Sequence, residues 1–159
     1  MKKMILSLAA VITMGFSVLA NGNGNVANGN DNVATQQARD AFKKDFTTAS
    51  NIRWEQKNNF LKATFSLNGQ ILTAYYFPNG DLQAVVRNIT SDQLPLNLLT
   101  SLRRDYTAYW ITDLFEISSN GETTYYVSIE NSDKKIVLKS DDISSWDVYS
   151  KQRKTDEAQ

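Results

Sequence analysis

The sequence predicts an α+β domain of two tandem α-β-β-β-β units, whose strands form one antiparallel sheet of about eight strands with two helices packed on one face. Two helix-like stretches with one apolar face stand about 60 residues apart. Each is followed by four short strand-like runs, separated by turn signals such as Asn68-Gly69. Similar residues recur in the same order in both halves, which indicates an internal repeat.

The first unit is expected over about residues 36–90. Its helix is indicated by apolar residues at helical spacing, namely Ala38, Ala41, Phe42 and Phe46. Strands are expected at 51–55, 60–67, 70–77 and 82–89, with a turn at 78–81. Because Asn68-Gly69 is typical of a two-residue hairpin turn, Leu67 is expected to pair with Gln70. This register places the apolar side chains of both strands on the face that meets the helices.

The second unit is expected over about residues 91–150. Its helix is indicated by residues that step by four, namely Leu94, Leu98, Leu102 and Tyr106. Strands are expected at 109–118, 123–130, 134–139 and 145–149. A two-residue turn at Asn120-Gly121 would pair Glu116 with Tyr125. A three-residue loop would instead pair Phe115 and Ile117 with Val127 and Tyr125, and we expect this more apolar register.

The repeat is visible as three matches between the halves. Residues 41–47 align with 101–107 at an offset of 60, and from residues 42 and 102 onward both stretches read apolar, basic, basic, Asp, aromatic, Thr. Residues 65–67 align with 127–129 at an offset of 62, and residues 82–84 align with 146–148 at an offset of 64. Small loop insertions explain the drift, so the chain is expected to contain two copies of one unit.

The N-terminus is typical of a secretory signal peptide. Lys2 and Lys3 precede an apolar run of about 16 residues, and Ala20 suits the position before a cleavage site. A membrane anchor is the alternative, but the run is shorter than the roughly 20 residues that span a bilayer. We therefore expect a signal peptide at 1–20 and a periplasmic or secreted protein with no stable membrane anchor after cleavage. Residues 21–35 are expected to form an Asn/Gly-rich flexible linker, and 151–159 a charged tail.

The sequence has no Cys and no His, which excludes disulfides, Cys-His and Ser-His-Asp catalysis, and the common zinc sites. The densest acidic cluster is Asp141 and Asp142 with Asp147, and a second pair is Asp113 with Glu116. Calcium binding or a glycosidase-type carboxylate pair is less favoured there than turn chemistry. We predict no catalytic residue, no metal site and no cofactor.

Two further groups of residues have a functional and a structural interpretation. The basic pairs Lys43-Lys44 and Arg103-Arg104 could bind anions, but a solvated helix face is favoured. Trp54, Trp110 and Trp146 could form a stacking site for sugars or peptides, but core packing is favoured. Cleavage after Ala20 leaves 15 basic and 17 acidic side chains, so a nucleic-acid partner is not expected.

A set of short motifs is spread over most of residues 36–150, namely Ala41-Phe42, Phe46, Ile52-x-Trp54, Ala63-x-Phe65, Ala74-Tyr75-Tyr76, Asn79-Gly80-x-Leu82 and Leu94-Pro95. On these residues the chain resembles the PepSY-like family, which consists of secreted, β-lactamase-inhibitor-like proteins common in the Bacteroidetes. It implies the β-lactamase-inhibitor-protein-like fold of tandem α-β4 units. PepSY domains proper inhibit or chaperone peptidases, but no residue of that activity can be matched in this sequence.

The sheet face away from the helices is the candidate binding face. In the expected register it presents, on two neighbouring strands, Phe60, Lys62, Thr64, Thr73, Tyr75 and Phe77. Large aromatic residues on an open sheet face are frequent anchors at protein interfaces, although they can also serve only to stiffen a hairpin. We expect an exported, non-enzymatic module that binds an envelope protein or peptide, as an inhibitor or chaperone of an envelope enzyme would. The alternative is a binder of a small molecule or glycan.

Overall fold

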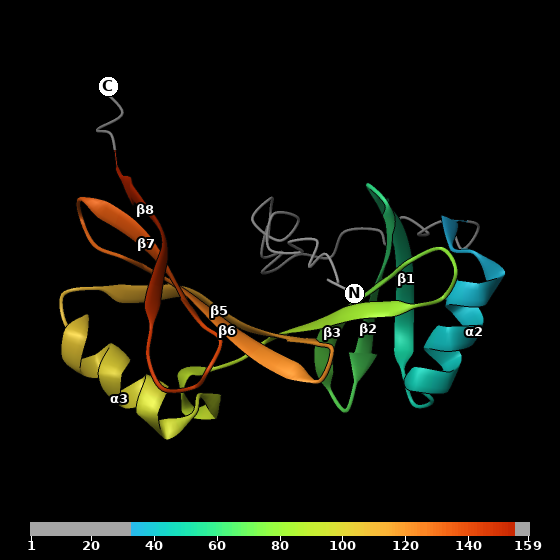
Figure 1. Cartoon of the computed structure of the whole chain (residues 1–159), viewed down its shortest axis with the longest axis horizontal. Coiled ribbons are helices and arrows are strands. Elements are labelled where there is room, and N and C mark those ends of the chain that lie inside the picture. Colours follow the sequence, from blue (N-terminus) through green and yellow to red (C-terminus); the bar gives the residue numbers. More distant parts are fainter. Residues whose placement is uncertain (1–32, 155–159) are drawn as a thin grey trace, which may run out of the picture.

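The computed structural model describes residues 33–154. The predicted signal peptide, most of the predicted linker and residues 155–159 lie outside this range. Figure 1 shows a strongly twisted sheet that bends into a broad arch, with helix α2 (Gln36–Asp45) near one end and helix α3 (Leu96–Asp105) near the other. Neither helix, nor any other within residues 33–154, has the length and apolar character needed to cross a membrane.

The sheet contains eight strands in sequence order, and each strand is antiparallel to its neighbours. The strands of the first unit are β1 (Ser50–Lys57), β2 (Phe60–Leu67), β3 (Gln70–Tyr76) and β4 (Leu82–Asn88). Those of the second are β5 (Trp110–Ser119), β6 (Glu122–Glu130), β7 (Lys134–Ser140) and β8 (Asp147–Arg153). A short 3₁₀ helix, η2 (Ser91–Gln93), precedes α3. The predicted α+β fold with tandem α-β4 units is therefore confirmed.

Helix α2 covers the first half of the sheet. Thr35 caps it, because the Thr35 hydroxyl oxygen accepts a hydrogen bond from the backbone N–H of Ala38 at 3.2 Å. Phe42 is fully buried and its ring lies 4.9 Å from that of Phe65 in β2 and 5.5 Å from that of Trp54 in β1. These contacts form the core of the first unit.

Helix α3 covers the second half of the sheet on the same face. Its buried residues Leu98 and Leu102 face a separate apolar core that includes Val127 of β6 and Leu138 of β7. The indole N–H of Trp146, in the loop before β8, donates a hydrogen bond to the backbone carbonyl of Leu98 at 3.0 Å. Each unit thus has its own helix-covered core, while the sheet runs through both.

The predicted register of the first hairpin is confirmed, since Leu67 pairs with Gln70 across Asn68-Gly69. The preferred register of the second hairpin is wrong. Ser119 pairs with Glu122 and Glu116 with Tyr125, which leaves a two-residue turn at Asn120-Gly121. Both turn residues have positive φ, 53° and 82°, as a type I′ turn requires. Turn geometry therefore outweighed the more apolar pairing.

Glu116 is tolerated on the helix-covered face because a cation lies beside it. Arg87 of β4 pairs with Glu116 in the sheet, and the two side chains form an ion pair at 2.8 Å. The Arg87 guanidinium also donates to the Gln70 side chain at 3.2 Å. The apolar argument for the other register overlooked Arg87.

Strand pairing refines the repeat. Helices α2 and α3, and strands β1 and β5, are related by an offset of 60. Trp54 pairs with Ala63, whereas the equivalent Leu114 pairs with Val127, which stands 64 positions after Ala63. The sequence match at an offset of 62 aligned Phe65 with Val127, whereas the strand pairing makes Ala63 the equivalent of Val127. The sequence alignment is therefore two residues off, on the same face of the strand, because the β5–β6 hairpin is longer than the β1–β2 hairpin.

The last strand extends further than predicted. The sequence placed it at 145–149, with a charged tail from residue 151, whereas β8 runs from Asp147 to Arg153. Lys134 pairs with Arg153, and the Lys154 ammonium lies 3.3 Å from a Glu130 carboxylate oxygen. A neighbouring strand and an acidic partner thus hold part of a stretch whose composition alone resembles a tail.

Candidate functional site

The candidate site is the sheet face opposite the two helices, called here the open face. The pairing of β2 with β3 places four of the six predicted residues on it, with Lys62 opposite Tyr75 and Thr64 opposite Thr73. Phe60 and Phe77 stack at the end of this pair, with ring centroids 5.0 Å apart and planes 20° from parallel. These six residues therefore share the sheet face away from the helices.

Their predicted exposure is only partly correct. Phe60 and Tyr75 are 6% and 4% exposed, and Thr73 is also buried. Lys62, Thr64 and Phe77 are half-buried. The reason is lateral packing, because the open face carries its own apolar cluster, in which Phe60 and Tyr75 contact residues of later strands.

That cluster crosses from the first unit into the second. Its buried members are Phe60, Tyr75, Ala84, Val86, Ile117 and Tyr126, and Phe77, Phe115 and Val137 pack against it. The crossing lies at the β4–β5 pair, where Val86 is opposite Ile117. The cluster is therefore continuous across the duplication, and its central members are buried.

The second-unit residues of this face were missed by the sequence analysis. Phe115 and Tyr126 stack at 5.2 Å with planes 11° apart, and Tyr149 of β8 meets the Tyr126 ring edge-on at 5.6 Å. Tyr149 is 40% exposed, so it forms an accessible rim. The alternation along β6 could have revealed Tyr126, since it lies between Tyr125 and Val127, which face the helices. The incorrect hairpin register concealed this grouping.

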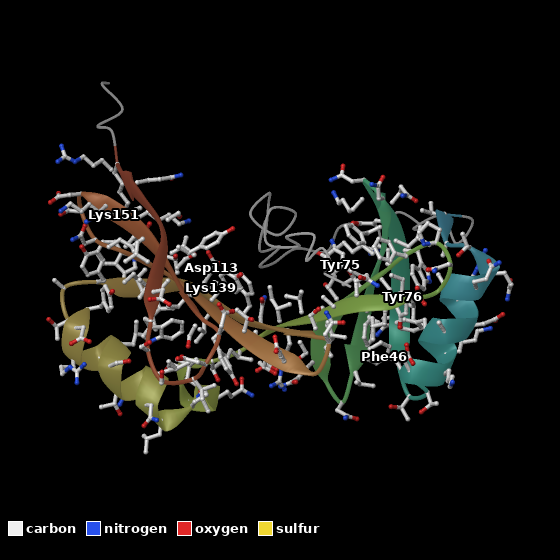
Figure 2. The ribbon with its side chains drawn as sticks, in the orientation of Figure 1. Phe46, Tyr75, Tyr76, Asp113, Lys139 and Lys151 are labelled. Atoms are coloured by element: carbon white, nitrogen blue, oxygen red, sulfur yellow. The ribbon has the colours of Figure 1, made fainter. Side chains whose placement is uncertain are left out.

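Ion pairs border the open face in both units. The Lys62 ammonium lies 3.1 Å from a Glu55 carboxylate oxygen in the first unit, and the Lys139 ammonium lies 2.7 Å from Asp141 in the second. Thr124 also donates a hydrogen bond to Asp141 at 2.9 Å. Figure 2 shows Tyr75 on the first-unit half of the sheet, and Asp113 and Lys139 on the other half. The aromatic cluster thus has an ion pair beside it in each unit, Lys62 with Glu55 and Lys139 with Asp141.

Two tyrosines of the open face, Tyr75 and Tyr126, stay protonated near neutral pH. Burial raises the pKa of Tyr75, and the nearby Glu55 carboxylate raises it further. Burial, with smaller contributions from Tyr149 and Asp141, raises the pKa of Tyr126 to about 12. These phenols therefore present neutral hydroxyl groups that can donate hydrogen bonds. On the opposite face, burial and the 3.0 Å hydrogen bond to Asp45 raise the pKa of Tyr76.

The acidic groups singled out in the sequence do not form a catalytic pair. Asp113 lies on the open face and Glu116, three residues later in β5, lies on the helix-covered face. Asp142 accepts hydrogen bonds from the backbone N–H and the hydroxyl of Ser144, as turn chemistry predicts. Within residues 33–154 no three acidic side chains are grouped closely enough to hold a metal ion.

The three tryptophans do not share one site. Trp54 is buried in the first core and Trp146 packs against the second core. Trp110 is 51% exposed at the start of β5, where its indole N–H donates to Glu130 at 3.0 Å. The Lys154 ammonium lies over this ring, 5.2 Å from its centroid. The prediction of core packing thus holds for Trp54 and Trp146, while Trp110 is a surface residue.

Comparisons with known proteins agree with this fold. Neither a family model nor a curated protein matches the chain. The chain is similar to the structure of a BLIP-like protein from Bacteroides fragilis NCTC 9343, with 21% identity, a TM-score of 0.65, and coverage of 79% of this chain and 92% of that one. A second similar structure is a "putative periplasmic" protein from Bacteroides eggerthii DSM 20697, with 16% identity, a TM-score of 0.67, and coverage of 76% and 88%.

A third similar structure is a DUF2874 family protein from Bacteroides ovatus ATCC 8483, with 14% identity, a TM-score of 0.67, and coverage of 76% of this chain and 87% of that one. At such identities the likeness establishes the fold alone. The chain therefore has the BLIP-like fold that the sequence resemblance implied. Membership of the PepSY-like family stays a prediction, because no family model matches.

Proposed function

We propose that this protein is an exported, non-enzymatic module that binds another protein of the cell envelope through its open face. The observation that carries the proposal is the continuous aromatic cluster across both units, on the one sheet face that neither helix covers. The partly exposed aromatic members of this face, Phe77, Phe115 and Tyr149, belong to the residue types that dominate binding energy at protein interfaces.

The packing of the cluster supports this role. Tyr75 and Tyr126 are buried and pack against the other side chains of the cluster, which fixes their positions. Phe77 and Tyr149 are more accessible and lie at opposite ends of the cluster. Aromatic side chains held in this way lose little conformational entropy on binding, so more of their contact energy appears as affinity. The charged borders at Lys62 and Lys139 would add orientation and selectivity.

Three further points agree with the proposal. The sequence has neither Cys nor His, so the usual nucleophile and metal chemistries are missing. The fold is shared with a BLIP-like protein and with a protein described as periplasmic. The N-terminal 20 residues have the pattern of a cleaved signal peptide. Inhibition or chaperoning of an envelope enzyme is the finer form of this function that the fold suggests.

The test uses rim residues, because Tyr75→Ala would open a cavity in a buried cluster and confuse folding with binding. Phe77→Ala and Tyr149→Ala are expected to keep the circular dichroism spectrum and to abolish retention of the partner in pull-downs from the envelope fraction. Leu96→Ala is the matched control, since Leu96 is 75% exposed on α3, away from the open face. Equal retention by all three variants would remove the open face from the account. A glycan that raises the melting temperature of the wild-type protein, with no protein retained, would favour the alternative ligand class.

A further inference from the structure

Strand β1 forms an edge of the sheet that has no strand partner among residues 33–154. It pairs only with β2, at one end of the strand order, and α2 stands beside it (Figure 1). An unpaired edge presents backbone N–H and C=O groups that can pair with a further strand. The question is whether this edge carries features that select a particular occupant.

The duplication itself contains an occupied version of the same edge. Strand β5 occupies the position in the second unit that β1 occupies in the first, and β4 pairs with it antiparallel, with Val85 opposite Ser118 and Asn88 opposite Phe115. The backbone N–H of Ile89 also donates to the carbonyl of Leu114 at 3.0 Å. By the offset of 60, the equivalent carbonyl on β1 is that of Trp54. A strand there would run from Trp54 to Lys57, where β1 ends.

A cleft of about 230 Å³ opens beside this edge, between β1 and α2. Trp54, Ile52 and Phe42 give it an apolar lining, and Arg39 and Lys43 of α2 add positive charge. Ile52 is 41% exposed, so part of this apolar lining remains accessible. Arg39 is held in place by a 2.7 Å hydrogen bond from its guanidinium to the Ala34 carbonyl, while Lys43 is exposed. The cleft therefore suits an apolar side chain next to a carboxylate.

The charges around the edge disfavour a second copy of this chain. Strand β1 carries exposed Arg53 and Lys57, and its one acidic residue, Glu55, forms an ion pair with Lys62. Pairing β1 with β1 of another copy would bring basic side chains together. The other edge of the sheet, β8, is also basic toward its end, with Lys151 and Arg153. Like charges across a strand pair are destabilising, so a partner of opposite charge is favoured.

We propose that β1 binds an extended acidic segment of another protein as an additional antiparallel strand. The segment would place an apolar side chain against Ile52 and Trp54 and a carboxylate next to Lys43. Backbone pairing along residues 54–57 supplies affinity, and the cleft supplies selectivity. This site lies on the helix-covered side and edge of the sheet, so it is separate from the open face and does not depend on the function proposed for that face.

The probe is a fluorescent peptide of the pattern Thr-Val-Thr-Glu-Thr-Val-Thr, in which Val and Glu share one face of a strand. Its counterpart carries Lys in place of Glu, and a third peptide carries N-methyl groups on alternate residues to block backbone pairing. Fluorescence anisotropy with the purified protein is expected to detect binding of the first peptide only. Equal binding of the Lys peptide or of the N-methylated peptide, or no binding of the Glu peptide, would overturn the proposal.

Matched variants test the position of the peptide. Lys43→Glu is expected to weaken binding about tenfold, because it replaces an attraction to the peptide carboxylate with a repulsion. Lys44→Glu makes the same change on the next residue, which does not line the cleft, and is expected to leave affinity nearly unchanged. Ile52→Thr keeps strand propensity and should also weaken binding. Equal effects of Lys43→Glu and Lys44→Glu, or a dimer on size-exclusion chromatography that the peptide dissociates, would contradict the assignment.

Discussion

Replacing Phe42 with alanine is expected to destabilise the protein by about 3–5 kcal/mol, the range for removing a fully buried phenylalanine. Phe42 is 2% exposed and joins α2 to the sheet. Its ring lies 5.2 Å from that of Phe46, 5.5 Å from Trp54 and 4.9 Å from Phe65. The substitution removes all of these ring contacts and leaves a cavity that the close-packed neighbours cannot readily fill. A loss of this size is a large part of the 5–15 kcal/mol that typical domains possess.

The assay is urea unfolding followed by circular dichroism and tryptophan fluorescence. Trp54 reports on the first core and Trp146 on the second, so variants that retain one tryptophan at a time separate the two units. We expect one cooperative transition from both reporters, because the β4–β5 pair and the open-face cluster join the units. Leu102→Ala, at the equivalent position of α3, is the matched control and should cost about 2–5 kcal/mol.

Two outcomes would refute this reasoning. A loss below about 1 kcal/mol for Phe42→Ala would mean that the first core does not depend on the aromatic packing described above. Separate transitions, with Trp54 unfolding early in Phe42→Ala and Trp146 unaffected, would mean that the units fold independently despite the shared sheet. In that case the open face could not be treated as one rigid surface.

Three further predictions concern the turns, a buried phenol and an ion pair. Gly80→Ala should cost more stability than Gly121→Ala in thermal unfolding, because both residues have positive φ but a Cβ at Gly80 would lie 2.9 Å from the Gln37 carbonyl oxygen, whereas none lies within 4 Å at Gly121. Tyr76→Phe should cost about 0.5–1.5 kcal/mol by urea unfolding, through loss of the hydrogen bond to Asp45; no change would refute that bond. Burial works to raise the pKa of Asp141, but hydrogen bonds from Lys139 and Thr124 outweigh it and lower that pKa. The ionised Asp141 therefore stabilises the fold above about pH 4, and this contribution is lost as the pH falls further. Asp141→Asn should make the free energy of unfolding depend less on pH below about pH 4. An unchanged pH dependence would count against the Lys139–Asp141 ion pair.

The fold was predictable because several local signals agree. The apolar spacing of α2 and α3, the Asn68-Gly69 turn and the offset of 60 each point to the same duplicated unit. The register of the first hairpin followed from its turn, which needs two residues with positive φ. The same rule at Asn120-Gly121 would have given the second register, but the apolar match was weighted more heavily. Only the structure revealed that Arg87 neutralises Glu116 on that face.

The candidate site was only half predictable. Alternation placed Phe60, Lys62 and Tyr75 on one face correctly, because strand geometry has a fixed period of two. Their burial depends on contacts with strands far away in the sequence, such as that of Ile117, and these follow from the β4–β5 pairing. No pattern within a single hairpin encodes that pairing. The same holds for the cleft at β1, which requires α2 and the sheet edge to be placed together.

The most direct test of the central claim is site-specific photo-crosslinking in the native cell envelope. A photoreactive phenylalanine derivative would replace Phe77 and Tyr149 on the open face, and Leu96 on α3 as the control. If the open face binds an envelope protein, the first two positions yield the same crosslinked protein and position 96 yields none. A crosslinked product from position 96 alone, or none from either open-face position, would contradict the account.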